Sequence, residues 1–199
     1  MLSASDPTAE AEISNALSNE LIVGQNIAFD MGVIAHNFPK LQPLIWSAYN
    51  EGRVLCTMVL EKLIAVAHGW VNSDPRTGGQ LRFSLAHLAH AYLGIEVEGK
   101  TEADAWRYRF RELDGVPLDR WPEAAKKYAL DDALLTFEVY QAQCAFQIEQ
   151  KTIVPDAIAR TRGHWALHLM GAWGLRTNKD RVLTLKNELA ARVGNARSH

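Results

Sequence analysis

The segment of residues 121–140, WPEAAKKYALDDALLTFEVY, constrains this chain most strongly, because its pattern is typical of a long helix. The proline at its second position suits the first turn of a helix, where a backbone N–H would have no partner. Positions three and four residues apart share one helix face. Here those positions are Ala125, Tyr128, Ala129, Asp132, Leu135, Thr136 and Val139. We expect this face to be buried.

The same face carries Asp132, one turn beyond Tyr128. A carboxylate on an apolar face is unfavourable unless a partner satisfies it. The partner can be a neighbouring turn of the chain, or else a metal ion or a hydrogen-bond network. The helix alone favours the neighbouring turn, whereas a second motif upstream favours a functional site.

That second motif is LIVGQNIAFD, which ends at Asp30. The apolar run 21–23 predicts a short strand buried on both faces. Gly24 ends the run and Asn26 suits a turn. Asp30 is then expected to cap a helix over residues 31–38.

Together the two motifs resemble a known family. VGQNIAFD is similar to the second conserved motif of the 3′–5′ exonuclease domain in the bacterial DNA polymerase I family (family A), and YALDD is similar to its third motif, Tyr-x-x-x-Asp. SLAHLAHAYLG, at residues 84–94, resembles the helix between them. The stretch from Trp106 to Asp132 looks most like phage-encoded members. The resemblance covers residues 10–146 and implies an α/β fold, the ribonuclease H-like exonuclease fold.

The resemblance also implies a chemistry, the two-metal hydrolysis of a phosphodiester at a DNA 3′ end during proofreading. By position, Asp132 is expected to be a direct metal ligand and Asp30 to hold a second ion through water. Tyr128 is expected to position the attacking water, and Asn26 to lie near the terminal nucleotides. The expected cofactors are two Mg²⁺ or Mn²⁺ ions, because carboxylates are hard oxygen ligands. The expected partner is a single-stranded DNA 3′ end.

One feature of the family is missing from the sequence. The family carries an Asp-x-Glu motif on the opening strand of its sheet, upstream of the second motif. The acidic residues before Glu20 are Asp6, Glu10 and Glu12, and none of them forms Asp-x-Glu. We therefore expect a fold that lacks its first strands, with weak metal binding by Asp30 and Asp132. A split gene or a mis-set start would explain this, and an upstream fragment carrying Asp-x-Glu is the expected partner.

Two domains are expected. Residues 1–150 are assigned to the exonuclease-like domain, and residues 151–199 to the helical start of a polymerase domain that would continue downstream. The sequence KTIVPD, which contains a helix-breaking proline, joins them. Helices are predicted over residues 157–173, closed by a glycine, and over residues 179–193.

Residues 106–111, WRYRFR, alternate aromatic rings with arginines. Such a segment can bind single strands, because rings stack on bases and guanidinium groups hold phosphates. The alternative, which the sequence favours, is an amphipathic surface segment whose rings pack inward.

The composition narrows the setting. The net charge of −2 excludes a general polycationic attraction to nucleic acid, so any binding must be local. The two cysteines show no metal-type spacing. No signal peptide and no membrane-spanning stretch are recognisable, so we expect the cytoplasm of a bacterial or phage-infected cell.

Two functions from different classes remain open. The first is a proofreading 3′–5′ exonuclease module, which the retained Asp30, Tyr128 and Asp132 favour. The second is a non-catalytic structural or DNA-binding scaffold of a polymerase, which the missing Asp-x-Glu favours. An RNA exonuclease of the ribonuclease D type shares the chemistry and is a minor alternative.

Overall fold

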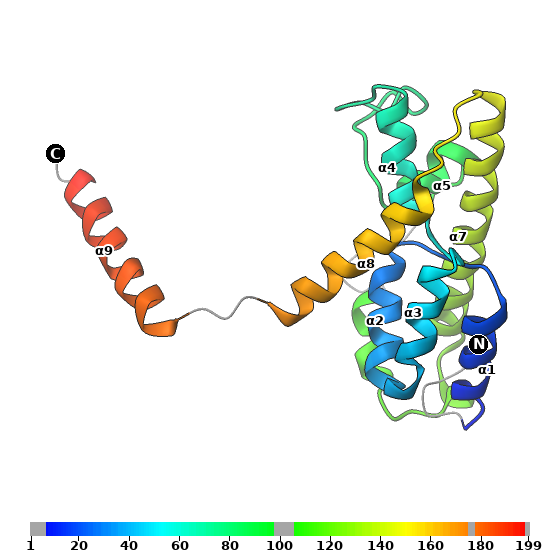
Figure 1. The fold of residues 1–199 in the computed structure, drawn as a ribbon, viewed down its shortest axis with the longest axis horizontal. Coiled ribbons are helices and arrows are strands. Elements are labelled where there is room, and N and C mark those ends of the chain that lie inside the picture. Colours follow the sequence, from blue (N-terminus) through cyan, green and yellow to red (C-terminus); the bar gives the residue numbers. More distant parts are fainter. Residues whose placement is uncertain (1–6, 98–105, 175–177, 198–199) are drawn as a thin grey trace. The chain divides into compact units, whose positions relative to one another are not determined.

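The computed structural model describes residues 7–97, 106–174 and 178–197 and divides into two compact units, Met1–His168 and Leu169–His199. Helices dominate the described residues, and one small sheet accompanies them (Figure 1). The α-helices and strands in chain order are α1 (Ala9–Asn19), β1 (Ile22–Gly24), α2 (Ile27–Asn37), α3 (Gln42–Asn50), β2 (Val54–Cys56), α4 (Thr57–Ala67), α5 (Leu85–Leu93), α6 (Trp106–Arg109), α7 (Glu123–Glu149), α8 (Ala157–Trp173) and α9 (Lys179–Arg197). Short 3₁₀ turns are η1 (Pro39–Leu41), η2 (Phe110–Leu113) and η3 (Leu118–Arg120). A mixed α/β chain is thereby confirmed.

The two strands run parallel, with Ile22 opposite Val54 and Gly24 opposite Cys56. β2 is buried along its whole length, and the backbone N–H of Cys56 donates to the Thr161 hydroxyl of α8 at 3.3 Å. This contact occupies a backbone group of β2 that points away from β1. Among the described residues β1 pairs with β2 alone, so its second edge is open.

The open edge explains one wrong prediction. Residues 21–23 were expected to form a strand buried on both faces. Instead, Leu21 is 52% exposed, and Ile22 and Val23 are half-buried. A central strand needs neighbours on both edges to be covered in this way, and β1 has one.

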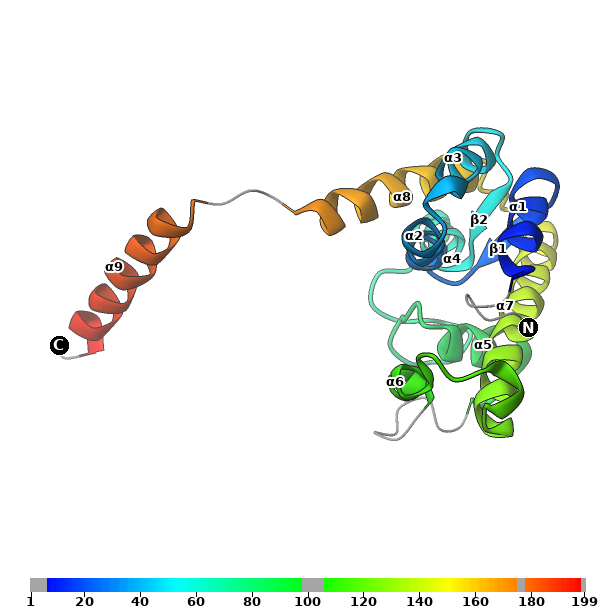
Figure 2. The same cartoon turned by 90° about the horizontal axis from the view of Figure 1, so that it is seen from below.

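Helices cover the sheet on both sides (Figure 2). α7 contacts β1, and α2 contacts both strands. α5 packs on α7 through a cluster of apolar residues, made of Leu85, Leu88, Ala89 and Val139. The packing of these elements holds the two sequence motifs close to each other.

The helix predicted from residue 121 onward is α7, which begins at Glu123 after Pro122. Its predicted face is confirmed, because Ala125, Thr136 and Val139 are buried. Leu130 and Leu134, which lie off that face, are 47% and 62% exposed.

The start of α2 differs from the prediction. Asp30 was expected to cap a helix at residue 31, but α2 begins at Ile27 and Asp30 lies within it. The capping position belongs to Asn26, whose φ of 58° is left-handed. Asparagine tolerates this conformation better than most residues, so the chain turns there and the helix begins at once.

α8 spans the predicted residues 157–173, and Gly174 closes it with a φ of 68°. Within the first unit, Thr161 and Trp165 of α8 are buried, and the Trp165 ring stacks on Tyr49 at 5.5 Å. The boundary expected at residue 150 stays a prediction.

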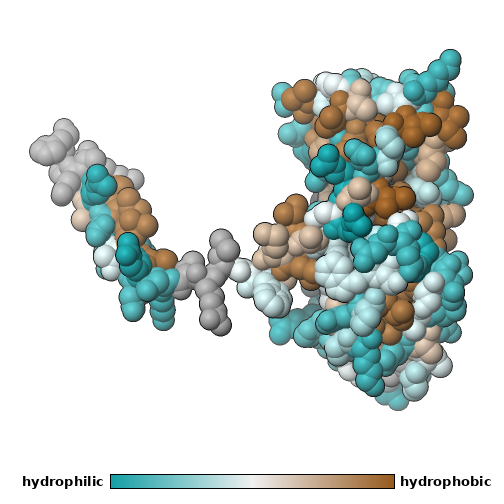
Figure 3. Space-filling view, in the orientation of Figure 1, coloured by the Kyte–Doolittle hydropathy of each residue, from teal (hydrophilic) through white to brown (hydrophobic). Residues whose placement is uncertain are grey.

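The second unit contains α9, which extends four residues beyond its predicted end at residue 193, to Arg197. Asn178 caps it, because its Oδ1 accepts the backbone N–H of Arg181 at 3.0 Å. Apolar surface runs along one side of α9 (Figure 3). Its exposed apolar residues are Val182, Leu183, Leu185, Leu189 and Val193. None of the described helices is long and apolar enough to cross a membrane.

Candidate active site

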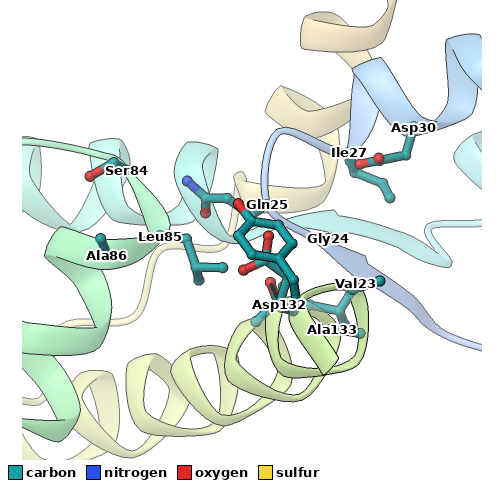
Figure 4. A pocket seen from close by; sticks show the side chains of 13 residues that line it. Val23, Gly24, Gln25, Ile27, Asp30, Ser84, Leu85, Ala86, Asp132 and Ala133 are labelled. Atoms are coloured by element: carbon teal, nitrogen blue, oxygen red, sulfur yellow. Dashed lines mark hydrogen bonds between the residues drawn. The ribbon is translucent and has the colours of Figure 1, made fainter. Parts of the chain in front are cut away.

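Three of the four residues singled out in the sequence meet in one pocket of about 690 Å³. Asp30 comes from α2, whereas Tyr128 and Asp132 come from α7. Figure 4 shows Asp30 at one end of the pocket, Ser84 at the other, and Asp132 between them. Segments far apart in the sequence therefore supply one site.

A tight turn brings Asp30 to this pocket. Gly24 ends β1, and a Cβ at that position would lie only 2.4 Å from Cδ1 of Ile27. An added Cβ would therefore displace the end of the Ile27 side chain and crowd Ile27 Cβ at 3.0 Å, so glycine suits the close start of α2 after the strand. Asp30 follows one turn later, on the side of α2 that faces the pocket.

The fourth residue, Asn26, is the turn residue itself. It is exposed and does not line the pocket. Its left-handed backbone is what the turn requires. A contact between Asn26 and DNA stays a prediction.

α7 carries the opposite wall. Tyr128 and Asp132 are one turn apart and both half-buried. The Tyr128 ring meets the Phe110 ring nearly edge-on, with centroids 5.9 Å apart. The Thr136 hydroxyl donates to the backbone carbonyl of Asp132 at 2.7 Å. The two candidate side chains thus sit on a helix surface that is held by packing.

The start of α5 forms a third wall through Ser84, Leu85 and Ala86. The Ser84 hydroxyl oxygen caps α5 by accepting the backbone N–H of His87 at 3.3 Å.

Gln25 also lines the pocket, although it was not among the residues predicted from the sequence. Its Nε2 donates to the Phe83 carbonyl at 2.7 Å, and its Oε1 accepts the Thr57 hydroxyl at 2.5 Å. The residue lies inside the motif LIVGQNIAFD, directly before Asn26. Its position next to the turn was the one sequence feature that pointed to Gln25. An uncharged amide in an apolar segment does not stand out as a buried carboxylate does.

The surroundings of Asp30 disfavour the charged form of its carboxyl group. Its outer side is open to solvent, but surrounding protein desolvates the carboxyl group. This burial raises the pKa of Asp30, and a hydrogen bond from its own backbone N–H offsets the rise only in part. A carboxyl group whose pKa is shifted by desolvation at a pocket is a common feature of functional sites.

The acidic residues that line the pocket do not fit two metal ions by themselves. Asp30 and Asp132 are the carboxylates in its wall. Within the described residues, no three His, Cys, Asp or Glu side chains are grouped closely enough to hold a metal ion. A two-ion site needs ligands for both ions at once, so these two side chains are an incomplete set.

The alternating segment 106–111 forms α6 and the start of η2. Its Trp106 and Phe110 rings pack against each other, and the Phe110 ring also packs against Trp121. The centroid of the Phe110 ring lies 6.2 Å from that of Trp106 and 5.8 Å from that of Trp121. The Arg109 guanidinium stacks on Trp106 at 4.5 Å and pairs with Glu112 at 3.0 Å. Inward packing of Trp106 and Phe110 agrees with the favoured alternative, whereas Tyr108 is 57% exposed.

Comparison with known proteins places the chain in a family. Residues 5–142, more than half of the chain, match the model of a family described as 3′–5′ exonuclease. This match confirms the resemblance drawn from the two motifs. No curated protein and no solved structure matches the chain.

Proposed function

This chain belongs to the 3′–5′ exonuclease family, and from that premise we propose that its pocket is part of a site that removes nucleotides from DNA 3′ ends. The observation that carries the proposal is the meeting of Asp30, Tyr128 and Asp132 in one pocket. The sequence motifs named these residues independently of any structure. Their convergence is what a shared catalytic role requires.

The chain is a 3′–5′ exonuclease portion of a polymerase-type protein. We assign it more narrowly to the proofreading domain of a DNA polymerase I-like enzyme, with a ribonuclease H-like fold. The parallel pair β1 and β2, covered by helices on both sides, is compatible with that fold. The helices after residue 150 would then begin the polymerase domain.

Each of the four residues singled out in the sequence has a proposed task. Tyr128 would hold the attacking water with its hydroxyl group, one helical turn from Asp132. Asp30 and Asp132 would supply carboxylate oxygens to metal ions. Asn26 would contact the terminal nucleotides from the turn.

Exonucleases of this family generally depend on divalent metal ions. We propose two Mg²⁺ or Mn²⁺ ions, held by Asp30 and Asp132 together with carboxylates from a further acidic segment. The open edge of β1 is a suitable entry for that segment, because Val23 and Gly24 of this strand line the pocket. An extended segment added to a sheet edge gains main-chain hydrogen bonds and places alternate side chains toward one face. An Asp-x-Glu sequence on it would point both acids to the same side.

The incomplete set of carboxylates also favours a second candidate, a non-catalytic scaffold that binds DNA beside a polymerase. The two candidates differ in whether added carboxylates restore hydrolysis. An RNA exonuclease of the ribonuclease D type is a third outcome, which differs only in substrate.

The test uses single-stranded DNA labelled at its 5′ end, with Mn²⁺ or Mg²⁺, and RNA of the same sequence in parallel. A synthetic peptide with Asp-x-Glu between β-branched residues is added to the full chain, and a peptide with Asn-x-Gln is the matched control. We expect the chain to shorten the DNA stepwise from its 3′ end when the acidic peptide is added, but not with the control peptide. This shortening should disappear when the chain carries Asp132→Ala.

The other outcomes are equally informative. Shortening by the chain alone that disappears in Asp132→Ala would overturn the need for further acids while keeping the exonuclease assignment. Shortening of RNA but not DNA would favour the ribonuclease alternative. DNA binding without shortening under any condition, in folded protein, would favour the scaffold.

A further inference from the structure

A buried ionic cluster lies outside the pocket, beneath the loop of residues 69–83 that joins α4 to α5. Arg76 of this loop donates from Nη2 to Glu61 Oε1 at 2.6 Å and to Asp74 Oδ2 at 2.7 Å, and from Nε to Asp74 Oδ1 at 2.9 Å. The side chains of Glu61 and Asp74 are fully buried, and that of Arg76 is 12% exposed. His87 Nε2 lies 3.0 Å from Asp74 Oδ2. One guanidinium therefore holds two buried carboxylates.

Aromatic rings surround the same guanidinium group. Its carbon lies 4.4 Å from the Tyr92 ring centroid, 4.8 Å from that of Trp70 and 5.8 Å from that of Phe146. Removal of one member of such a buried pair leaves the others uncompensated, which strongly destabilises the arrangement. Arg76 thus fixes the loop to the helices beneath it.

Hydrogen bonds continue from this cluster to the pocket. Gln143 of α7 donates from Nε2 to Glu61 Oε2 at 2.9 Å and to the Thr57 carbonyl at 3.1 Å. The Thr57 hydroxyl donates to Gln25 Oε1, and Gln25 Nε2 donates to the carbonyl of Phe83. Phe83 lies at the end of the loop that Arg76 fixes. The Gln25 amide is therefore held from two sides, and both sides trace back to the cluster.

We propose that Arg76 is a positioning residue for the pocket, which holds the loop of residues 69–83 so that Thr57 and Phe83 fix the Gln25 amide for contact with a nucleic-acid strand. The amide nitrogen carries two N–H groups, and Phe83 accepts one of them. The second is available to a phosphate or base oxygen. The contact with a strand rests on the proposed function, whereas the orientation of Gln25 does not.

The orientation is tested in the full chain without DNA, by the side-chain amide signals of Gln25 in a ¹⁵N-labelled sample. Loss of these signals in Gln25→Ala identifies them. We expect Arg76→Gln to move them and Arg82→Gln to leave them in place. Arg82 is the matched control, because it lies in the same loop and is exposed, and its side chain donates to Gln80 Oε1 at 3.3 Å instead of joining the Arg76 cluster.

A second variant guards against unfolding of Arg76→Gln. Asp74→Asn keeps the size of the side chain but removes one charge of the cluster, and it is expected to move the Gln25 signals in the same direction by a smaller amount. Unchanged Gln25 signals in whichever of the two variants is folded would overturn the proposal.

Binding measurements then test the consequence. The probe is a short oligothymidylate with a fluorescent 5′ label, titrated without metal so that no hydrolysis occurs. We expect Arg76→Gln to weaken binding of the probe about 3- to 10-fold, the equivalent of one hydrogen bond. In a chain that already carries Gln25→Ala, adding Arg76→Gln should change the affinity very little.

If the two substitutions weaken binding independently, so that their fold-losses in affinity multiply in the double variant, Arg76 does not act through Gln25 and the proposal is contradicted. If the wild-type chain does not bind the probe, the proposed function fails, and the amide signals still decide the role of Arg76. The two failures are therefore distinguishable.

Discussion

At Asp30, folding and function make opposite demands. Partial burial disfavours the charged carboxylate and raises its pKa. A catalytic or metal-binding role needs that charge in place. Under the proposed function, the charge of Asp30 is therefore kept at some expense of stability.

This conflict predicts a pH-dependent gain in stability for Asp30→Asn. Because the folded pKa is above the ordinary value of 3.8, the folded state favours the protonated form. The protonated Asp30 side chain therefore contributes to the stability of the folded state below pH 3.8, and this contribution is lost as the pH rises through the folded pKa. The variant should therefore melt at a higher temperature than the wild type at neutral pH, with the difference vanishing in acid.

Thermal unfolding followed by circular dichroism across this pH range measures the effect. Asp114→Asn is the control, because Asp114 is an exposed turn residue whose replacement by Asn preserves turn preferences. An Asp30→Asn variant that is less stable at neutral pH would contradict the assignment of burial as the dominant influence.

The sequence singles out residues at which burial and charge conflict. Asp132 and Tyr128 could be selected because an acid on a buried helix face needs a reason. Gln25 could not, because its significance depends on Phe83 and Thr57, which lie far away in the sequence. Asn26 was selected from the same motif, and the structure shows that its left-handed backbone forms the turn between β1 and α2.

Among the elements, the loop of residues 69–83 is held by buried charges. Burial alone would raise the pKa of Asp74, but hydrogen bonds from the Arg76 side chain and backbone, with its charge and a bond from His87, outweigh burial. Together they hold the pKa of Asp74 at about 2. The loop is thus anchored by an acid that stays ionised in the folded state well below its ordinary pKa.

The lowered pKa predicts how acid affects the loop. A depressed carboxyl pKa contributes stability above the unfolded value, here 3.8, that is lost as the pH falls toward 2. Asp74→Asn should cost about 1–3 kcal/mol at neutral pH, as expected for hydrogen bonds with a charged group, and progressively less in acid. Urea unfolding at several pH values tests this, and a constant difference at every pH would contradict it.

Element positions were predictable to different degrees. α5, α7 and α8 follow from periodicity and from their flanking proline, serine and glycine residues. The start of α2 was misplaced, because a left-handed asparagine is not visible in a pattern of apolar residues. The burial of β1 was overestimated, because a strand's sequence does not state how many neighbours it has.

At the scale of the whole molecule, the extent of the first unit is open to a direct test. Thr161 and Trp165 are buried in this unit although they follow residue 150, the boundary expected from the sequence. A chain ending at residue 168 should unfold at nearly the same urea concentration as the full chain. A chain ending at residue 150 should lose about 3–5 kcal/mol or more, since it loses a buried tryptophan.

Equal stability of both shortened chains would contradict this expectation and favour the boundary at residue 150. The long-range pairs that decide the matter, such as Thr161 with Cys56, join distant segments. Periodicity reports only local structure, so neither these pairs nor the cluster of Arg76, Glu61 and Asp74 could be read from the sequence.

The claim that the pocket receives a DNA 3′ end is tested most directly by photocrosslinking. A single strand with a photoreactive thiothymidine at its 3′ end is irradiated with the full chain, and the modified peptides are mapped by mass spectrometry. A strand with the same nucleotide at its 5′ end is the control. We predict that the 3′ probe attaches within residues 21–30, 84–86 or 121–140 and that the 5′ probe attaches elsewhere. Attachment of the 3′ probe only outside these segments, in folded protein, would contradict the account.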